Sequence, residues 1–401
     1  MGEVGGDQSP HVSSSNIIPT ARSIWFRHCL TGTPALLILR WSISRSLRRC
    51  VLRPGPLLFD LELDRNLVDR TCNLGLSTIV EVYKSARVLT DDEFVSHVLI
   101  KDILSAPYKE PMNPKIAFMF LTPGSLPFEK LWEKFFLGHE GRFSIYVHAS
   151  REKPVHVSPL FVDRDIQSGK VMWGKISMVD AERRLLANAL QDPDNQHFVL
   201  LSDSCVPLHN FDYVYNYLMG TNVSFIDCFW DPGPHGNARY TEHMLPEIEE
   251  KDFRKGSQWF SMKRRHALIV LADNLYYTKF KLYCKPGFDG RNCYADEHYL
   301  PTLLSMVDPT GISNWSVTHV DWSEGKWHPK AYRAQDVTFE LLKNVTSIDE
   351  SYHVTSDEKK MVTVKPCLWN GMKRPCYLFG RKFYPEALDN LMQLFSNYTL
   401  I

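Results

Sequence analysis

Several features are missing from this sequence, and each absence removes a class of protein. The 401 residues contain no Cys-x-x-Cys pattern and no Cys/His pattern at zinc-ligand spacing, so no structural metal site is expected. Lysine plus arginine and aspartate plus glutamate each total 46, which leaves no net charge to attract nucleic acid or an anionic membrane. With 44% hydrophobic and 12% aromatic residues, the chain is predicted to bury a large core and to be globular.

Acidic residues are absent from the segment between Gln8 and Phe59. Arginines are scattered there among serines, at Arg22, Arg27, Arg40, Arg45, Arg48, Arg49 and Arg53. Its apolar centre, residues 30–39, is shorter than the roughly 20 residues that a membrane-spanning helix needs. Residues 1–60 are therefore interpreted as a basic leader, with a secretory signal, an organellar transit peptide and a degenerate membrane anchor all left open.

Two patterns favour the secretory route. Four Asn-x-Ser/Thr sequons follow the leader, at Asn222, Asn314, Asn344 and Asn397. Two equally spaced cysteine pairs are also present, Cys284 with Cys293 and Cys367 with Cys376. Each pair encloses a loop containing glycine or proline that a disulfide could close, the alternative being reduced and buried thiols.

Hydrophobic periodicity becomes strong only after residue 114, so residues 61–114 are interpreted as a stem or linker and 115–401 as one domain. Strands are expected at 115–122, 142–149, 197–204, 223–229 and 256–262. Helices are expected between them, including one after a Ser177/Asp180 capping box, which extends to residue 191. Alternating strands and helices predict an α/β fold.

Ligands of open α/β sheets bind beyond the carboxyl ends of the strands. This rule directs attention to Ser202 and Asp203, and to the loop of residues 231–240, which is rich in glycine and proline and contains Arg239. A second candidate is the pair Asp296 and Glu297 at the start of a helix near Ala295. Two interpretations of this pair stay open. The carboxylates stabilise the N-terminus of the helix, or one of them is a general base at the mouth of a pocket.

Nine motifs occur in one order between Lys115 and Leu394: KIAFMFLT, WEKFFLGHEGRFSIYVHAS, MVDAERRLLANAL, FVLLSDSCVPL, DPGPHGNARY, KGSQWFSMKR, YADEHYLPTLL, VDW and CYLFGRKF. Together they resemble the plant branch of the core-2/I-branching β-1,6-N-acetylglucosaminyltransferase family. The resemblance implies a GT-A-like fold, with a mixed, mostly parallel sheet flanked by helices. It also implies a Golgi location with a lumenal catalytic domain behind an N-terminal anchor, although this N-terminus lacks the family's clear apolar span. A soluble secretory protein or an organellar one is the alternative.

The resemblance further implies an inverting transfer from a UDP-sugar, with N-acetylglucosamine expected as the sugar, to a hydroxyl of a glycan or glycoprotein acceptor. Glu297 then matches the general base, and Asp296 supports the helix start. On the diphosphate, Lys382 matches the family lysine, Arg374 is a weaker match to its arginine partner, and Arg381 lies beside them in GRKF.

No cofactor and no metal are expected. The two Asp-x-Asp patterns, at Asp163/Asp165 and Asp192/Asp194, do not end convincing strands, and the triplet that begins at Ser202 lacks a second carboxylate.

Acceptor contacts are expected from Trp259 and Trp322, since an indole face packs against a pyranose, and from Asp321 and Arg239. For Trp259, a position in the hydrophobic core is an equal alternative. One alternative is a catalytically silent glycan-binding protein on the same fold. Another is a glycoside hydrolase, but adjacent carboxylates such as Asp296 and Glu297 are poorly placed to face each other across a sugar at about 5 to 9.5 Å.

Overall fold

The structure is a computed structural model that describes residues 91, 94–95, 98–99, 113–326 and 328–399. The predicted leader (1–60) and most of the predicted stem (61–114) lie outside these residues. A few helical residues of the stem are described, and they pack on the domain. Val98 is buried in one of its hydrophobic clusters, and Asp91 accepts a hydrogen bond from Arg184 at 3.0 Å. The folded part therefore includes residues upstream of 115.

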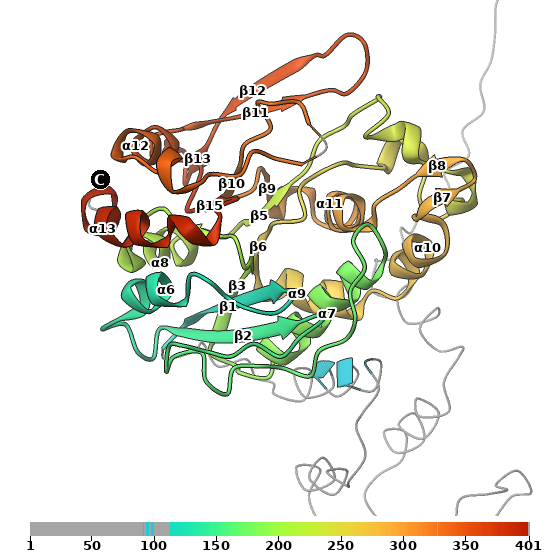
Figure 1. The fold of residues 1–401 in the computed structure, drawn as a ribbon. Coiled ribbons are helices and arrows are strands. Elements are labelled where there is room, and N and C mark those ends of the chain that lie inside the picture. Colours follow the sequence, from blue (N-terminus) through green and yellow to red (C-terminus); the bar gives the residue numbers. More distant parts are fainter. Residues whose placement is uncertain (1–90, 92–93, 96–97, 100–112, 327, 400–401) are drawn as a thin grey trace, which may run out of the picture. The chain divides into compact units, whose positions relative to one another are not determined.

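The centre of the domain is a six-stranded sheet with the order β2-β1-β3-β6-β5-β9 (Figure 1). Its strands are β1 (Lys115–Thr122), β2 (Phe143–Ala149), β3 (Asn195–Ser202), β5 (Ser224–Asp227), β6 (Ser261–Lys263) and β9 (Ile312–Asn314). Only β6 runs antiparallel to its neighbours. The sheet is thus mixed and mostly parallel, as predicted.

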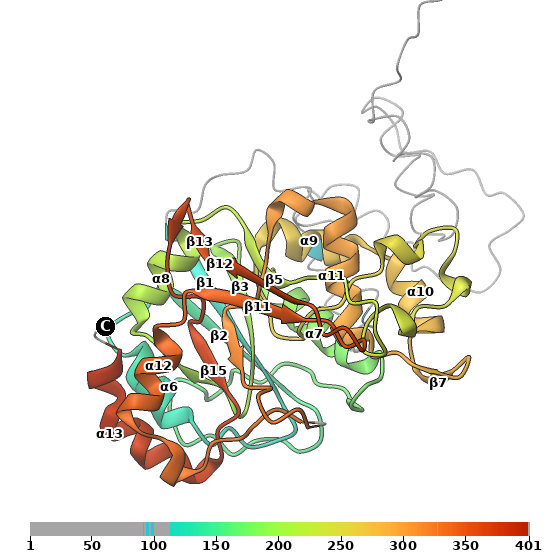
Figure 2. The same cartoon turned by 90° about the horizontal axis from the view of Figure 1, so that it is seen from above.

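Helices cover both faces of this sheet (Figure 2). One face carries α6 (Glu129–Phe136), α8 (Phe211–Met219), α12 (Phe339–Thr346) and α13 (Leu388–Tyr398). The other face carries α7 (Ser177–Ala189), α9 (Arg264–Ala272), α10 (Leu275–Tyr283) and α11 (Ala295–Val307). Strand β1 is apolar from Ile116 to Leu121 because successive side chains point to opposite faces, and both faces are covered.

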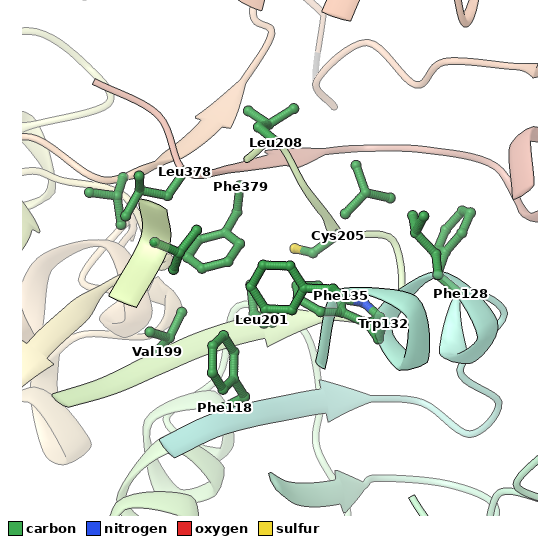
Figure 3. Close-up of a cluster of buried hydrophobic side chains, with 14 of the residues drawn as sticks. Phe118, Phe128, Trp132, Phe135, Val199, Leu201, Cys205, Leu208, Leu378 and Phe379 are labelled. Atoms are coloured by element: carbon green, nitrogen blue, oxygen red, sulfur yellow. The ribbon is translucent and has the colours of Figure 1, made fainter. Parts of the chain in front are cut away.

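Each face has its own hydrophobic cluster. Phe118 of β1 packs against Trp132 and Phe135 of α6 and against Phe379 near the C-terminus, with ring centroids 5.8 to 6.3 Å apart (Figure 3). The next residue, Met119, belongs to the cluster beneath α7 and α11. The C-terminal residues are therefore part of the core, which positions the segment that follows Phe379.

A second, three-stranded sheet contains β10 (Thr318–Val320), β15 (Phe379–Arg381) and β4 (Val206–Pro207). Strand β4 follows β3 after a short turn, so β15 is held next to the carboxyl end of β3. The backbone N–H of Phe383 donates to the carbonyl of Ser204 at 3.1 Å. Hairpins are formed by β7 (Pro286–Phe288) with β8 (Arg291–Asn292), β11 (Glu350–Val354) with β12 (Val362–Pro366), and β13 (Leu368–Trp369) with β14 (Met372–Lys373).

Both cysteine pairs form disulfides in the structure. Cys284 and Cys293 have Cα atoms 4.8 Å apart, and Cys367 and Cys376 have theirs 5.4 Å apart, within the range of an unstrained disulfide. The first bond joins the C-terminus of α10 to the residues just before α11, where Ala295 begins the helix. It therefore tethers the start of α11.

The predicted capping box of the helix after residue 176 is wrong. Ser177 lies inside α7, Ile176 precedes it with helical dihedral angles, and no side chain caps the helix. The Ser177 hydroxyl instead bonds the backbone of Met172 in the preceding loop, with its oxygen 3.0 Å from the Met172 nitrogen. The expected strands at 223–229 and 256–262 are also shorter, because the residues outside β5 and β6 form loops at the sheet edge.

Candidate active site

Loops converge at the edge of the sheet where β3 and β5 end. These two strands are parallel to each other because β6 is antiparallel to both. Asp203 follows β3, Asp227 ends β5, and the segment Gly256 to Trp259 enters β6 at the same edge. The structure thus brings together several of the predicted side chains, in two clusters.

The first cluster surrounds Glu297 in the first turn of α11. Its carboxylate accepts a hydrogen bond from an Nη of Arg239 at 2.7 Å and another from Nζ of Lys255 at 3.0 Å. The Glu297 side chain is 29% exposed, so solvent or a ligand can reach it. Burial alone would raise its pKa, but the charges of Lys255 and Arg239 outweigh this and lower the pKa to about 2. Glu297 is therefore an ionised carboxylate at neutral pH.

Asp296 has a different environment from its neighbour. It is buried, and one carboxyl oxygen has no hydrogen-bond partner among the described residues. Burial, together with the charge of Glu297, raises the pKa of Asp296 to about 7. Burial likewise raises the pKa of Glu182 on α7, whose carboxyl accepts a hydrogen bond from Gln258 at 3.2 Å. The adjacent carboxyls at the helix start thus have opposite pKa shifts.

Arg239 is held by the loop of residues 231–240. Asp231 at its start is fully buried and accepts hydrogen bonds from the backbone N–H and the hydroxyl of Ser356, at 2.8 and 2.7 Å. The loop ends in a short 3-10 helix, Asn237–Arg239. The Arg239 guanidinium then lies 4.6 Å from the centre of the Tyr294 ring and 3.3 Å from His298. These contacts fix the guanidinium beside Glu297.

Lys255 is a site residue that the sequence analysis missed. It lies in the RKGSQWF stretch, whose Lys–Gly pair was the available signal. Gly256 is required there, because a Cβ would lie 1.9 Å from the carbonyl oxygen of Asp227. The Gly256 N–H also donates to the backbone carbonyl of Glu297 at 2.9 Å. Close packing of this glycine therefore brings Lys255, β5 and the start of α11 together.

The second cluster lies at the end of β15. The Arg381 guanidinium stacks 4.0 Å from the centre of the Trp259 ring, and its Nε has no hydrogen-bond partner among the residues that the structure describes. Burial lowers the pKa of Lys382, and the neighbouring charge of Arg381 lowers it further. Burial raises the pKa of Asp203, although the charges of Arg381 and Lys382 oppose this. Two adjacent cations facing one carboxyl favour an anionic ligand.

The remaining predicted donor residues divide between the site and its surroundings. Ser202 is buried at the end of β3, and its hydroxyl lies 3.0 Å from that of Ser204, so it shapes the turn that carries Asp203. Arg374 is exposed, with its guanidinium 5.4 Å from the centre of the Trp369 ring. The indole N–H of Trp369 donates a hydrogen bond to the backbone carbonyl of Tyr217 on α8. Arg374 therefore packs on the side of the domain that carries α8.

The predicted acceptor residues also have distinct positions. Trp259 is only 6% exposed and covers the Arg381 guanidinium. This position favours a role in holding Arg381 over a role as a surface on which a sugar stacks. Trp322 is 52% exposed and free to stack with a ligand. Beside it, Asp321 accepts a hydrogen bond from the Tyr332 hydroxyl at 2.8 Å, and Tyr332 donates its backbone N–H to the carbonyl of Lys382. This links the Trp322 loop to the cationic cluster.

Carboxylates of both Asp-x-Asp patterns form contacts outside the two clusters. Lys115, at the opposite end of β1, pairs with Asp192 at 3.0 Å and Asp194 at 3.7 Å. Asp165 lies 3.3 Å from a ring nitrogen of His156. Across the described ranges, no three His, Cys, Asp or Glu side chains are grouped so that they could hold a metal ion.

Comparisons with known proteins identify the class and the family of the chain. Residues 116–346, more than half of the chain, match the model of the core-2/I-branching enzyme family. A glycosyltransferase of rice (Oryza sativa subsp. japonica), BC10, is 38% identical over 319 residues, which cover 71% of this chain and 77% of the rice protein. The α/β fold and these matches define the class of the protein, a glycosyltransferase. Within that class, the chain belongs to the core-2/I-branching enzyme family.

Proposed function

We propose that this protein moves a sugar, with N-acetylglucosamine as the first candidate, from a UDP-sugar to a hydroxyl of a glycan acceptor, with inversion at the anomeric carbon. The observation that carries the proposal is the ionised Glu297, held by Arg239 and Lys255 at the same sheet edge as the cations Arg381 and Lys382. A base for the acceptor and a binding site for a diphosphate are the two groups that such a transfer needs.

In the proposed reaction, the acceptor hydroxyl lies against Glu297. Its oxygen attacks the anomeric carbon from the face opposite UDP, its proton passes to the Glu297 carboxylate, and the bond to the diphosphate breaks. A pKa of about 2 makes Glu297 by itself a weak base. Hydroxyls of the acceptor that accept hydrogen bonds from Arg239 and Lys255 would weaken their hold on Glu297 and raise its pKa. Acceptor binding would therefore strengthen the base.

Departure of UDP develops negative charge on the diphosphate. Lys382 and Arg381 are proposed to stabilise this charge without a divalent metal, with Asp203 and Ser202 shaping the donor side. Support comes from the adjacency of two partly buried cations and the unpartnered Nε of Arg381 among the described residues. Arg374 stays a proposal of lower rank, because its contacts are with Trp369. On the acceptor side, exposed Trp322 and neighbouring Asp321 are proposed to contact the sugar.

We place this activity in the Golgi lumen, the usual location of the family. Two disulfides support an oxidising compartment. Three of the four sequon asparagines, Asn222, Asn344 and Asn397, are exposed. No helix in the described part of the chain is both long and apolar enough to cross a bilayer. Attachment to the membrane through the N-terminus stays a proposal.

A second candidate function is glycan binding without transfer. The observation that favours it is the depressed pKa of Glu297, because a carboxylate that binds its proton so weakly can serve as a hydrogen-bond acceptor for a sugar without acting as a base. Both functions use the same edge of the sheet.

One experiment separates the two functions. The chain from residue 89 onward is secreted from a eukaryotic host, and UDP release is measured for a panel of UDP-sugars with plant glycans as acceptors and excess chelator. Acceptor-dependent release that survives chelation and is lost in Glu297→Gln supports the metal-free transferase. Release that the chelator abolishes contradicts the role of Arg381 and Lys382. Glycan binding without any release supports the second candidate.

A further inference from the structure

An exposed aromatic surface lies beside the candidate active site, on the loop that precedes α7. Trp173 is 61% exposed, although tryptophan is usually well buried in a folded domain. Its ring centroid lies 5.0 Å from that of Tyr294 and 6.2 Å from that of His328. Trp173 and Tyr294 belong to segments far apart in sequence, and the loop before α7 approaches the start of α11 (Figure 1).

The approach of this loop to Tyr294 is close. Gly174 has a positive φ of 69°, and a Cβ at this position would lie 2.8 Å from the Tyr294 ring. The loop is also tied down at its far end, because the Ser177 hydroxyl bonds the Met172 backbone. The indole is therefore held on the surface by packing of its neighbours.

Trp173 is connected to the general base by three contacts in series. The Trp173 ring packs against the Tyr294 ring. The Arg239 guanidinium lies 4.6 Å from the centre of the Tyr294 ring and donates a hydrogen bond to Glu297 at 2.7 Å. Arg239 is buried, Tyr294 is partly buried and Trp173 is exposed, so exposure rises from Arg239 to the indole. A ligand that reaches Glu297 with one end can extend over Trp173 with the other.

We propose that Trp173, supported by Tyr294, is a stacking platform for an acceptor sugar beyond the one whose hydroxyl reacts, so that the enzyme selects oligosaccharide acceptors over single sugars. The proposal rests on the transferase function proposed above. An indole face presents apolar area and a negative π-surface to the C–H face of a pyranose. Two tilted rings, 45° apart, form a corner that an extended glycan chain can follow. The occupant is therefore a pyranose chain and not a nucleotide, whose proposed site lies at Arg381 and Lys382.

The test compares Trp173→Ala, Trp173→Phe and the wild type, with Leu137→Ala as the control, because Leu137 is 71% exposed just after α6. Each variant receives xylo-, cello- or galacto-oligosaccharides and the matching methyl monosaccharide. We expect Trp173→Ala to raise the KM for the best oligosaccharide about five- to tenfold, the size of a lost aromatic stacking contact. The KM for the UDP-sugar and the rate with the methyl monosaccharide should stay unchanged. Trp173→Phe should recover part of the loss.

Direct binding separates failure of this proposal from failure of the transferase. Affinity for the same oligosaccharides is measured by calorimetry, together with release of UDP. If the wild type binds an oligosaccharide but transfers nothing, the transferase fails, and weaker binding by Trp173→Ala still supports the platform. If Trp173→Ala and the wild type have equal KM and equal affinity, the platform is overturned. It is also overturned if the effect is as large with the methyl monosaccharide, or if the wild type binds none of the oligosaccharides.

Discussion

Two adjacent carboxyls, Asp296 and Glu297, have opposite electrostatic environments because successive residues on a helix point in directions about 100° apart. Glu297 faces two cations at the sheet edge, whereas Asp296 points into the domain near buried Glu182. The partly exposed carboxylate of Glu297 is thus ready to accept hydrogen bonds from a ligand, whereas the pKa of buried Asp296 is raised to about 7. The arrangement leads to two predictions on the pH dependence of stability.

The first residue-scale prediction concerns Glu297. Its folded pKa of about 2 is lower than its ordinary value of 4.5, so its contribution to stability is present above pH 4.5 and is lost as the pH falls through 2. Glu297→Gln should remove this part of the acid destabilisation. Thermal melts of both proteins between pH 5 and the lowest pH at which they stay soluble measure the difference. Parallel curves would contradict the ion pairs with Arg239 and Lys255.

Asp296 should have the opposite effect on stability. Its folded pKa of about 7 exceeds its ordinary value of 3.8, so the folded state binds the proton more tightly and stability falls as the pH rises from about 4 to 7. Asp296→Asn keeps the shape of the side chain without this titration. We expect the variant to be more stable than the wild type at pH 8, and its melting temperature to depend less on pH. A variant that is less stable at every pH would contradict this prediction.

At the scale of elements, the site depends on the close approach of three segments: the end of β5, the segment before β6 and the start of α11. Gly256 lies where they meet, between the carbonyl of Asp227 and Pro301 of α11. The disulfide Cys284–Cys293 tethers the residues before the same helix. Backbone packing, more than any single side-chain contact, therefore sets the distance from Lys255 to Glu297.

Gly256→Ala tests this packing. The new Cβ would lie 1.9 Å from the Asp227 carbonyl oxygen and 2.7 Å from Pro301, so backbone must move. We expect a loss of about 1–3 kcal/mol in the free energy of unfolding, the usual cost of overpacking, and a loss of transfer beyond that caused by instability. Gly124→Ala is the control, because the atom nearest to its Cβ, the Cβ of Glu152, would lie 3.4 Å away. Equal melting temperatures of the two variants would contradict the argument.

On the scale of the whole molecule, both halves of the proposed chemistry meet at the edge of the six-stranded sheet where β3 and β5 end. Strand β3 leads into β4, which pairs with β15 and so positions Arg381 and Lys382, while β5 and the segment before β6 pack beside the start of α11. Two separate hydrophobic clusters support the two faces of the sheet.

Glycosylation provides a whole-molecule prediction. Asn222 is exposed in the turn between α8 and β5, whereas Asn314 is only partly exposed at the end of β9. In protein secreted from a eukaryotic host, Asn222→Gln should remove one glycan, detected as a smaller mass shift on enzymatic deglycosylation. Asn314→Gln is the matched control and should change the mass shift little. No shift in any form of the protein would contradict the proposed secretory route.

The sequence by itself determined the strands and helices with strong periodicity. The run Ile116 to Leu121 is apolar at every position, and the helix start at Ala295 follows from its acidic first turn, so both were predictable from local pattern. Motif order also identified the family, which the comparison with the family model confirmed. The cysteine pairs, the carboxylate at Glu297 and the basic pair at Arg381 and Lys382 could likewise be named from the sequence.

Only the tertiary structure decided which of these residues meet. Lys255 bonds Glu297, and Trp259 covers Arg381. Both contacts arise because β6 is antiparallel to β3 and β5, so that the residues before β6 lie at the edge where those strands end. Local sequence pattern does not specify this strand pairing. The failed capping box at Ser177 has the same origin, since packing of the preceding loop redirected its hydroxyl to Met172. Long-range strand pairing and loop packing depend on contacts between residues distant in sequence. Such packing places Trp173 beside Tyr294, and Arg374 lies beside Trp369.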